Sequence, residues 1–324
     1  MTGSLAADPA RVGVRVRVPA TSANLGPGFD TFGLALGMYD EVDAALSTGG
    51  LSVEVSGEAA DDVPRDESHL VVSSMLAALR RWYGEPPGLQ VRCRNTIPHS
   101  RGLGSSAAAI VAGVVAARAL VGEHAPPRKR IGDDEVLDLA TELEGHPDNV
   151  AAALGGGFTV AWFDDDGARS VRLRPHDDVL PVVCVPDQPM STATARGLLP
   201  AEVPHQDAVF NASRSGLLVA AMTQRPDRLF EATQDRLHQP YRVAAMPATG
   251  RLLSDLRARG IAAVVSGAGP TLLALCDGRR QKASDVAAAA AASEDGAWRV
   301  EALGVDLDGV AVQPLADGLP GSGE

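Results

Sequence analysis

The chain reads Pro98-His-Ser-Arg-Gly-Leu-Gly-Ser-Ser-Ala-Ala108 between a predicted strand over 89–93 and a predicted buried helix over 105–121, and this stretch decides the fold. Glycines let the backbone approach a ligand closely, and a serine can cap the first turn of a helix. The free N–H groups of that turn, with the helix dipole behind them, form an anion site that requires no lysine. The residues alone leave a second interpretation open, in which a Gly-Ser turn only caps a buried helix.

Composition narrows the function classes. The chain has 324 residues, 45% of them hydrophobic, which suffices for one large or two ordinary domains. A formal charge of −12 argues against a nucleic-acid binder that works by neutralising phosphates. Only Lys129 and Lys282 are lysines, and neither follows a glycine, so a P-loop is excluded. Any nucleotide phosphates must therefore be held in another way.

The cysteines and the apolar segments indicate the compartment. Cys93, Cys184 and Cys276 lie far apart with no CxxC pair, which is typical of buried thiols in a reducing cytoplasm. The first residues lack the pattern of a signal peptide, and no apolar run reaches the roughly 18 residues that span a bilayer. We therefore expect a cytoplasmic protein that contacts neither membrane nor nucleic acid.

Strand-like alternation and helical periodicity occur in both halves of the chain, which predicts the α+β class. Strands are expected over 12–18, 51–55, 89–93, 158–163, 182–185, 262–265 and 271–276. Helices are expected over 70–83, 105–121, 133–144, 207–223, 226–237, 247–259 and 287–292. A charged, loop-like stretch up to Pro175 is the expected boundary between domains over 11–168 and 175–314, with flexible tails over 1–10 and 315–324.

Residues 98–108 match in full the pattern P-x-x-x-G-L-G-S-S-A-A, so the chain resembles the GHMP kinases (galacto-, homoserine, mevalonate and phosphomevalonate kinases). Residues 18–30, which read Val-Pro-Ala-Thr-Ser-Ala-Asn-Leu-Gly-Pro-Gly-Phe-Asp, resemble the family's first motif in its homoserine kinase form. Ser266–Ala274 resembles the third motif, and Glu144–Asn149 and Met190–Arg196 resemble further homoserine kinase segments. The resemblance implies the two-domain GHMP fold, with an N-terminal domain like ribosomal S5 domain 2, a ferredoxin-like C-terminal domain and the site in the cleft between them. It also suggests a homodimer.

The same resemblance implies an activity and assigns residues to it. The expected reaction is ATP-dependent phosphorylation of the L-homoserine hydroxyl to O-phospho-L-homoserine, a step toward threonine, with Mg²⁺ as cofactor. The residues expected to bind ATP are Asn95, Pro98, Gly102, Leu103, Gly104, Ser105, Ser106, Ala107 and Ala108. Glu144 and Ser106 match the Mg²⁺ ligands. The residues expected to bind the amino acid are Asn24, Asp30, His146, Asn149, Arg196, Arg242 and Gly267.

The chemistry of homoserine supports this division, because arginine suits its carboxylate and Asp30 can pair with its ammonium group. Asn149 stands where mevalonate-type members place an aspartate, and an amide cannot take a proton. We therefore expect no dedicated general base, with positioning and electrostatics supplying the catalysis. Asp148 is a rival base, but neighbours in a strand or turn usually point apart, which argues against it. Thr192 is expected to line the hydroxyl end of the pocket.

Three other functions stay open at this point. The first is a GHMP-family kinase that acts on another small hydroxylated acid or alcohol. The second is a catalytically inactive binding module, which would be expected to have lost the loop glycines, the loop serines or Glu144, all of which this chain retains. The third is a serine hydrolase, which Gly-Leu-Gly-Ser-Ser disfavours because the nucleophile motif is Gly-x-Ser-x-Gly.

Overall fold

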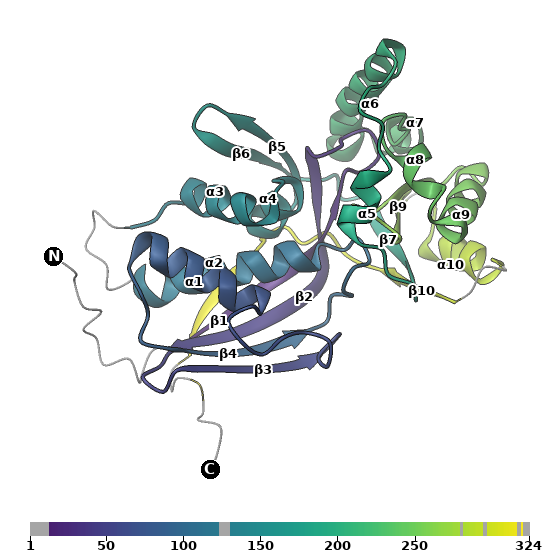
Figure 1. Cartoon of the computed structure of the whole chain (residues 1–324). Helices are drawn as coiled ribbons and strands as arrows, with labels where there is room; N and C mark the ends of the chain where they lie inside the picture. The colour runs from purple at the N-terminus through teal and green to yellow at the C-terminus, as the bar shows by residue number, and fades with distance from the viewer. Residues whose placement is uncertain (1–12, 123–129, 279–280, 294–296, 316–318, 320–324) are drawn as a thin grey trace.

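The computed structural model describes residues 13–122, 130–278, 281–293, 297–315 and 319. Helices pack against two separate β-sheets, one of seven strands and one of four, as Figure 1 shows. The α+β prediction is confirmed. The predicted tail over 1–10 lies outside the described residues, as does nearly all of the tail over 315–324.

The larger sheet has the order β11-β1-β2-β4-β3, and β5 pairs with β2 and with β6. Among its described strands, β3 and β4 form the one parallel pair. Helices cover one face of this sheet (Figure 1), and among them α2 is apolar on all sides and buried along most of its length. The bounds are β1 (Gly13–Ala23), β2 (Phe32–Leu46), β3 (Leu51–Gly57), β4 (Leu89–Asn95), β5 (Phe158–Asp164), β6 (Gly167–Leu173), β11 (Ala311–Leu315), α1 (Leu70–Trp82), α2 (Ser105–Gly122), α3 (Asp133–Glu144) and α4 (Asp148–Gly155).

The smaller sheet is antiparallel with the order β10-β7-β9-β8. Counted along the chain this is 4-1-3-2 with helical crossovers, the arrangement of a ferredoxin-like sandwich, so that prediction is also confirmed. The bounds are β7 (Val179–Pro186), β8 (Ala262–Val265), β9 (Leu272–Asp277), β10 (Trp298–Ala302), α5 (Thr192–Gly197), α6 (His205–Thr223), a 3₁₀ turn (Pro226–Arg228), α7 (Leu229–Ala232), α8 (Gln239–Val243), α9 (Pro247–Ala258) and α10 (Ala283–Ala291).

Three sequence predictions are wrong. The charged stretch up to Pro175 is not a loop, because Gly167–Leu173 pairs along its whole length with β5. The helix expected over 226–237 breaks after Ala232, because the Asp235 carboxylate accepts hydrogen bonds from the N–H groups of Leu237 and Gln239 and fixes a turn there. Finally, β11 pairs with β1, so the end of the chain returns to the first sheet, whereas the sequence placed it with the second domain.

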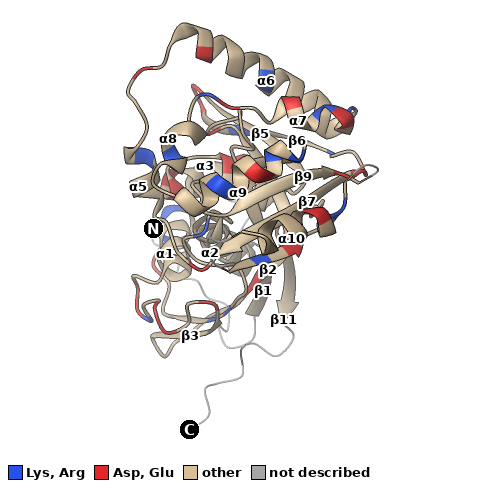
Figure 2. Cartoon of the chain, turned by 90° about the vertical axis from the view of Figure 1, so that its right-hand side faces the viewer, with Lys and Arg blue, Asp and Glu red and all other residues tan. Residues whose placement is uncertain are grey.

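Several surface and core features agree with the composition. All three cysteines are free and buried, and burial raises the pKa of the Cys93 thiol to about 12. Acidic and basic residues are interspersed along α6, α7 and α9 (Figure 2). Within the described part of the chain, every helix is too short or too polar to cross a membrane.

Candidate active site

Three distant segments meet where the two sheets join. The backbone N–H of Thr21 donates to the carbonyl of Leu103 at 3.0 Å. The Ser266 hydroxyl donates to the Gly102 carbonyl at 2.6 Å, and the Gly267 N–H donates to the Ala23 carbonyl at 3.1 Å. These bonds tie the segments quoted as the three motifs into one wall of a cavity of about 340 Å³.

The glycines of the Gly102–Ala108 loop are required by its backbone. Gly102 and Gly104 have φ angles of +76° and +70°, in the left-handed region that disfavours side chains. A Cβ at Gly102 would also overlap the Ser266 carbonyl, and one at Gly104 would overlap the Thr21 hydroxyl. The loop therefore lies directly on its neighbours, and α2 begins at Ser105 as predicted.

The cavity brings together every predicted site residue except Ala107. Ala107, in the first turn of α2, is fully buried in the core, and its predicted contact with ATP stays a prediction. The predicted residues that line the cavity are Asn24, Asp30, Asn95, Pro98, Gly102, Leu103, Gly104, Ser105, Ser106, Ala108, Glu144, His146, Asn149, Thr192, Arg196, Arg242 and Gly267. Their individual roles stay predictions.

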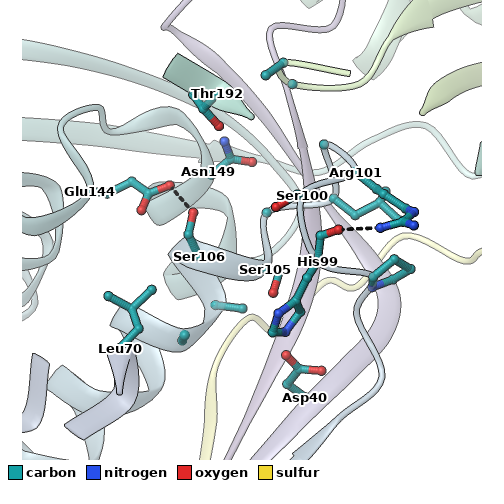
Figure 3. Close-up of a pocket in the computed structure, with 18 of the residues that line it drawn as sticks. Asp40, Leu70, His99, Ser100, Arg101, Ser105, Ser106, Glu144, Asn149 and Thr192 are labelled. Atoms are coloured by element: carbon teal, nitrogen blue, oxygen red, sulfur yellow. Dashed lines mark hydrogen bonds between the residues drawn. The ribbon is translucent and has the colours of Figure 1, made fainter. Parts of the chain in front are cut away.

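Glu144 and Ser106 form the predicted metal pair. Glu144 ends α3, Ser106 lies in the first turn of α2, and Figure 3 shows their side chains pointing toward each other. The Ser106 hydroxyl donates to Glu144 Oε1 at 2.7 Å. Burial raises the pKa of the Glu144 carboxyl, and the bond from Ser106 opposes that rise. A half-buried carboxylate beside a hydroxyl offers the oxygen ligands that suit Mg²⁺.

Asp148 and Asn149 open α4, and both are buried. Asn149 Oδ1 accepts from the Thr21 hydroxyl at 2.7 Å. Asp148 Oδ1 accepts from the Asn149 N–H at 2.7 Å and lies 3.1 Å from His146 Nδ1. The premise that these neighbours point apart is wrong, because in the first turn of a helix both side chains line the cavity.

Arg196 and Asp30 contact each other. The Arg196 guanidinium on α5 donates to both Asp30 oxygens, at 2.7 and 3.0 Å. The sequence assigned them to separate groups of a ligand, and the structure joins them in a bidentate pair. Asp30 is held in place by Asn24, whose Oδ1 accepts from the Asp30 N–H at 3.0 Å.

Arg242, on α8, is 1% exposed, and its guanidinium lines the cavity. Its Nη1 donates to the Gly267 carbonyl at 3.0 Å, and its Nε lies 3.3 Å from the Ala195 carbonyl. Among the described residues no carboxylate lies within ion-pair distance of it. Burial lowers its pKa, and the nearby charge of Arg196 acts in the same direction.

Sequence reasoning missed the far end of the cavity. Asp40 on β2 accepts from the N–H groups of Thr96 and Ile97 at 2.6 and 2.9 Å, and His99 lies beside it in Figure 3. His69, the residue before α1, is 5% exposed, and its Nδ1 has no hydrogen-bond partner. No motif marks Asp40 or His69, because only tertiary contact brings them to the cavity.

Sequence comparisons agree with this geometry. The family described as "GHMP kinases N terminal domain" matches residues 69–157, and "GHMP kinases C terminal" matches residues 204–294. A homoserine kinase from Streptomyces coelicolor is 54% identical over 304 residues, which cover 94% of this chain and 95% of that protein. The chain belongs to the homoserine kinase branch of the GHMP kinase family. A homoserine kinase from Mycobacterium tuberculosis is 52% identical over 80% of this chain and 82% of its own.

Solved structures place the fold of this GHMP kinase in the same family. The crystal structure of homoserine kinase from Cytophaga hutchinsonii superposes with a TM-score of 0.79 at 27% identity, covering 96% of this chain and all of that one. The structure of mevalonate kinase from L. major gives a TM-score of 0.62 at 16% identity over 94% of this chain and 98% of its own. That second likeness concerns the fold alone.

Proposed function

We propose that the chain transfers the γ-phosphoryl group of ATP to the side-chain hydroxyl of L-homoserine, giving O-phospho-L-homoserine. The observation that carries the substrate assignment is Arg242, a buried cation that faces the cavity with no carboxylate partner among the described residues. An unpaired buried charge is costly, so this position calls for an anion. The homoserine carboxylate supplies it, and Asp30 receives the ammonium group while Arg196 still contacts its other oxygen.

The opposite part of the cavity takes the nucleotide in this proposal. The Gly102–Ala108 loop and the start of α2 donate N–H groups to the phosphates. Asn95 lies at the nucleoside end with His69 and His99, which border the same cavity. No lysine takes part, in keeping with the two lysines of the whole chain.

We propose that Mg²⁺ is held by Glu144 and Ser106. The described residues contain no cluster of three acidic, histidine or cysteine ligands, but Mg²⁺ usually takes only one or two carboxylates and completes its shell with phosphates and water. The bound ion would neutralise charge on the transferring phosphoryl group. The raised pKa of the Glu144 carboxyl supports the assignment, because a poorly solvated carboxylate gains most from a cation.

We propose that no side chain acts as a dedicated general base. Thr192 and Asn149 then position the acceptor hydroxyl, and Asn149 is held by Thr21. Asp148 Oδ1 already accepts from the Asn149 N–H, which leaves it a structural role at the start of α4. Asp148→Asn should therefore retain turnover within about tenfold, whereas loss of a true base typically costs 10²–10⁴-fold.

We place the step in threonine biosynthesis in the cytoplasm, as the family resemblance implies. A homodimer is proposed on the family resemblance alone.

ADP release by the purified chain tests the proposal, with L-homoserine, mevalonate, galactose and shikimate as acceptors, each with and without Mg²⁺. We expect turnover with homoserine only, and only with Mg²⁺. Turnover of another acceptor in place of homoserine would favour the alternative, a GHMP kinase for another small hydroxylated acid or alcohol.

A further inference from the structure

His238 is fully buried next to Arg242, and its two ring nitrogens face groups of opposite character. Nε2 lies 2.7 Å from the carbonyl oxygen of Gly26, and Nδ1 lies 3.4 Å from Nη1 of Arg242. A carbonyl can only accept, so Nε2 must carry the proton. A guanidinium can only donate, so Nδ1 must be bare. The two contacts together fit only the neutral imidazole protonated on Nε2.

Phe29 extends this contact into a cluster. Its ring packs against the His238 imidazole with centroids 5.2 Å apart. The Cζ atoms of Arg242 and Arg196 lie 5.3 and 5.6 Å from the Phe29 centroid, within cation–π range. One aromatic pair therefore supports both guanidiniums, and Phe29 adjoins Asp30 in the chain.

His238 itself does not line the cavity, whereas Arg242 does. Any effect of His238 on a ligand must therefore pass through the arginine. We propose that His238 is a positioning residue: its bare Nδ1 fixes the rotamer of Arg242, so that the guanidinium meets the carboxylate of the amino-acid substrate. This inference rests on the proposed function.

Burial keeps His238 neutral, although charged groups surround it. The Asp235 carboxylate, 3.6 Å from Nε2, is satisfied by the N–H groups of Leu237, His238 and Gln239 and by the Asn211 amide. Burial lowers the pKa of His238, and the charge of Arg242 lowers it further, while Asp235, the Gly26 carbonyl and Asp30 act in the opposite direction. The acceptor at Nδ1 is thus present near neutral pH and is lost as pH falls through the lowered pKa.

A matched pair of substitutions at His238 distinguishes the role of Nδ1 from that of Nε2. His238→Asn keeps an acceptor near the position of Nδ1, and His238→Gln keeps a donor near the position of Nε2 but loses the acceptor. The assay measures KM for homoserine, KM for ATP and kcat, together with the inhibition constant of L-homoserine amide, which lacks the carboxylate charge. Thermal unfolding of each variant serves as the control for folding.

We expect His238→Gln to raise KM for homoserine about tenfold, since a hydrogen bond to a charged group is lost, with kcat and KM for ATP nearly unchanged. His238→Asn should stay within about threefold of the unaltered chain, and binding of the amide should change little in either variant. Equal effects of both variants, or parallel weakening of homoserine and the amide, would overturn the inference.

The unaltered chain provides a second test. This test remains available even if the His238→Gln variant does not fold. Lowering the pH should weaken homoserine binding before it weakens binding of the amide, and a parallel loss of both would overturn the inference. If the unaltered chain did not turn over homoserine, the proposed function and this inference would both be rejected. If the unaltered chain is active but both His238 variants behave alike, only this inference is rejected.

Discussion

Gly104→Ala tests whether the Gly102–Ala108 loop is fixed by contact with the first motif. An alanine Cβ there would overlap the Thr21 hydroxyl and come within 3.1 Å of Asn149 Oδ1. Thr21 is fully buried and cannot move aside without releasing its 2.7 Å hydrogen bond to Asn149. The substitution should therefore disturb the loop and Asn149 together.

The expected loss of stability has three parts. An L-residue at a φ of +70° costs about 1 kcal/mol. Overpacking a close contact costs about 1–3 kcal/mol, and the lost buried hydrogen bond about 1 kcal/mol more. We expect a fall of about 3–5 kcal/mol in the free energy of unfolding, together with a rise of at least about tenfold in KM for ATP, since tenfold corresponds to 1.4 kcal/mol of binding.

Gly260→Ala is the matched control. Gly260 has a φ of +78°, but nothing lies within 4 Å of an added Cβ. This variant should lose only about 1 kcal/mol and keep the activity of the unaltered chain. Urea unfolding and steady-state kinetics of both variants, and of Gly104→Ala combined with Thr21→Ala, complete the comparison. The double variant should recover part of the loss, because the overlapping hydroxyl is gone. If Gly104→Ala were no less stable than Gly260→Ala and bound ATP normally, the reasoning would be refuted.

Three further substitutions probe the metal pair, the buried cation and a surface ion-pair cluster. Glu144→Gln should lower kcat at least about a hundredfold and raise the Mg²⁺ concentration needed for half-maximal turnover, with little change in thermal unfolding; an unchanged Mg²⁺ titration would remove the metal assignment. Arg242→Met should abolish the stabilisation that homoserine gives in thermal unfolding while leaving the free chain as stable as before or more so, since a buried unpaired charge is removed; a large loss of stability would mean that the arginine is mainly structural. Asp43 is buried, which by itself raises its pKa, but hydrogen bonds from Arg15 and Arg94 leave the pKa below its usual value. Asp43→Asn should therefore lose about 2 kcal/mol at pH 7. The difference from the unaltered chain should shrink as pH falls below about 4 and vanish only once pH has passed the lowered pKa of Asp43; a difference that does not shrink in acid would contradict this.

Features specified by neighbouring residues could be predicted from the sequence. Helix α3 was placed correctly over 133–144, because its periodicity and the following glycine, which has a φ of +91°, are local signals. Strand β2 was missed, although it has 15 residues, because it is buried on both faces at one end and carries acidic residues at the other. A strand whose surroundings change along its length shows no clean alternation. Its identity depends on partners in distant segments, such as Thr159, which lies opposite Gly33.

The candidate site divides in the same way. Nearly all of the predicted site residues line the cavity, since each motif is a short run with its own backbone requirements. Pairing between motifs could not be predicted. Asp30 and Arg196 are 166 residues apart, and no pattern in either segment predicts that they contact each other. His238 was missed for a related reason: its role depends on the Gly26 carbonyl and on Arg242, which only the folded chain brings to its ring.

The site contains features that lower the stability of the folded chain, namely strained backbone and a buried charge. Of the five non-glycine residues with positive φ among those described, Asn24, Leu25, Asp30 and Ser100 lie in the first motif or in the segment Pro98–Ala108. Asparagine and aspartate tolerate this conformation, but for Leu25, which is fully buried at a φ of +49°, it is a strain. Arg242 adds an unpaired buried charge a short distance away. Neither feature stabilises the chain in the absence of ligand, and both persist only because the surrounding core holds them in place. Ligand binding should therefore stabilise the chain by mass action, by about 2.7 kcal/mol at a homoserine concentration a hundred times its Kd.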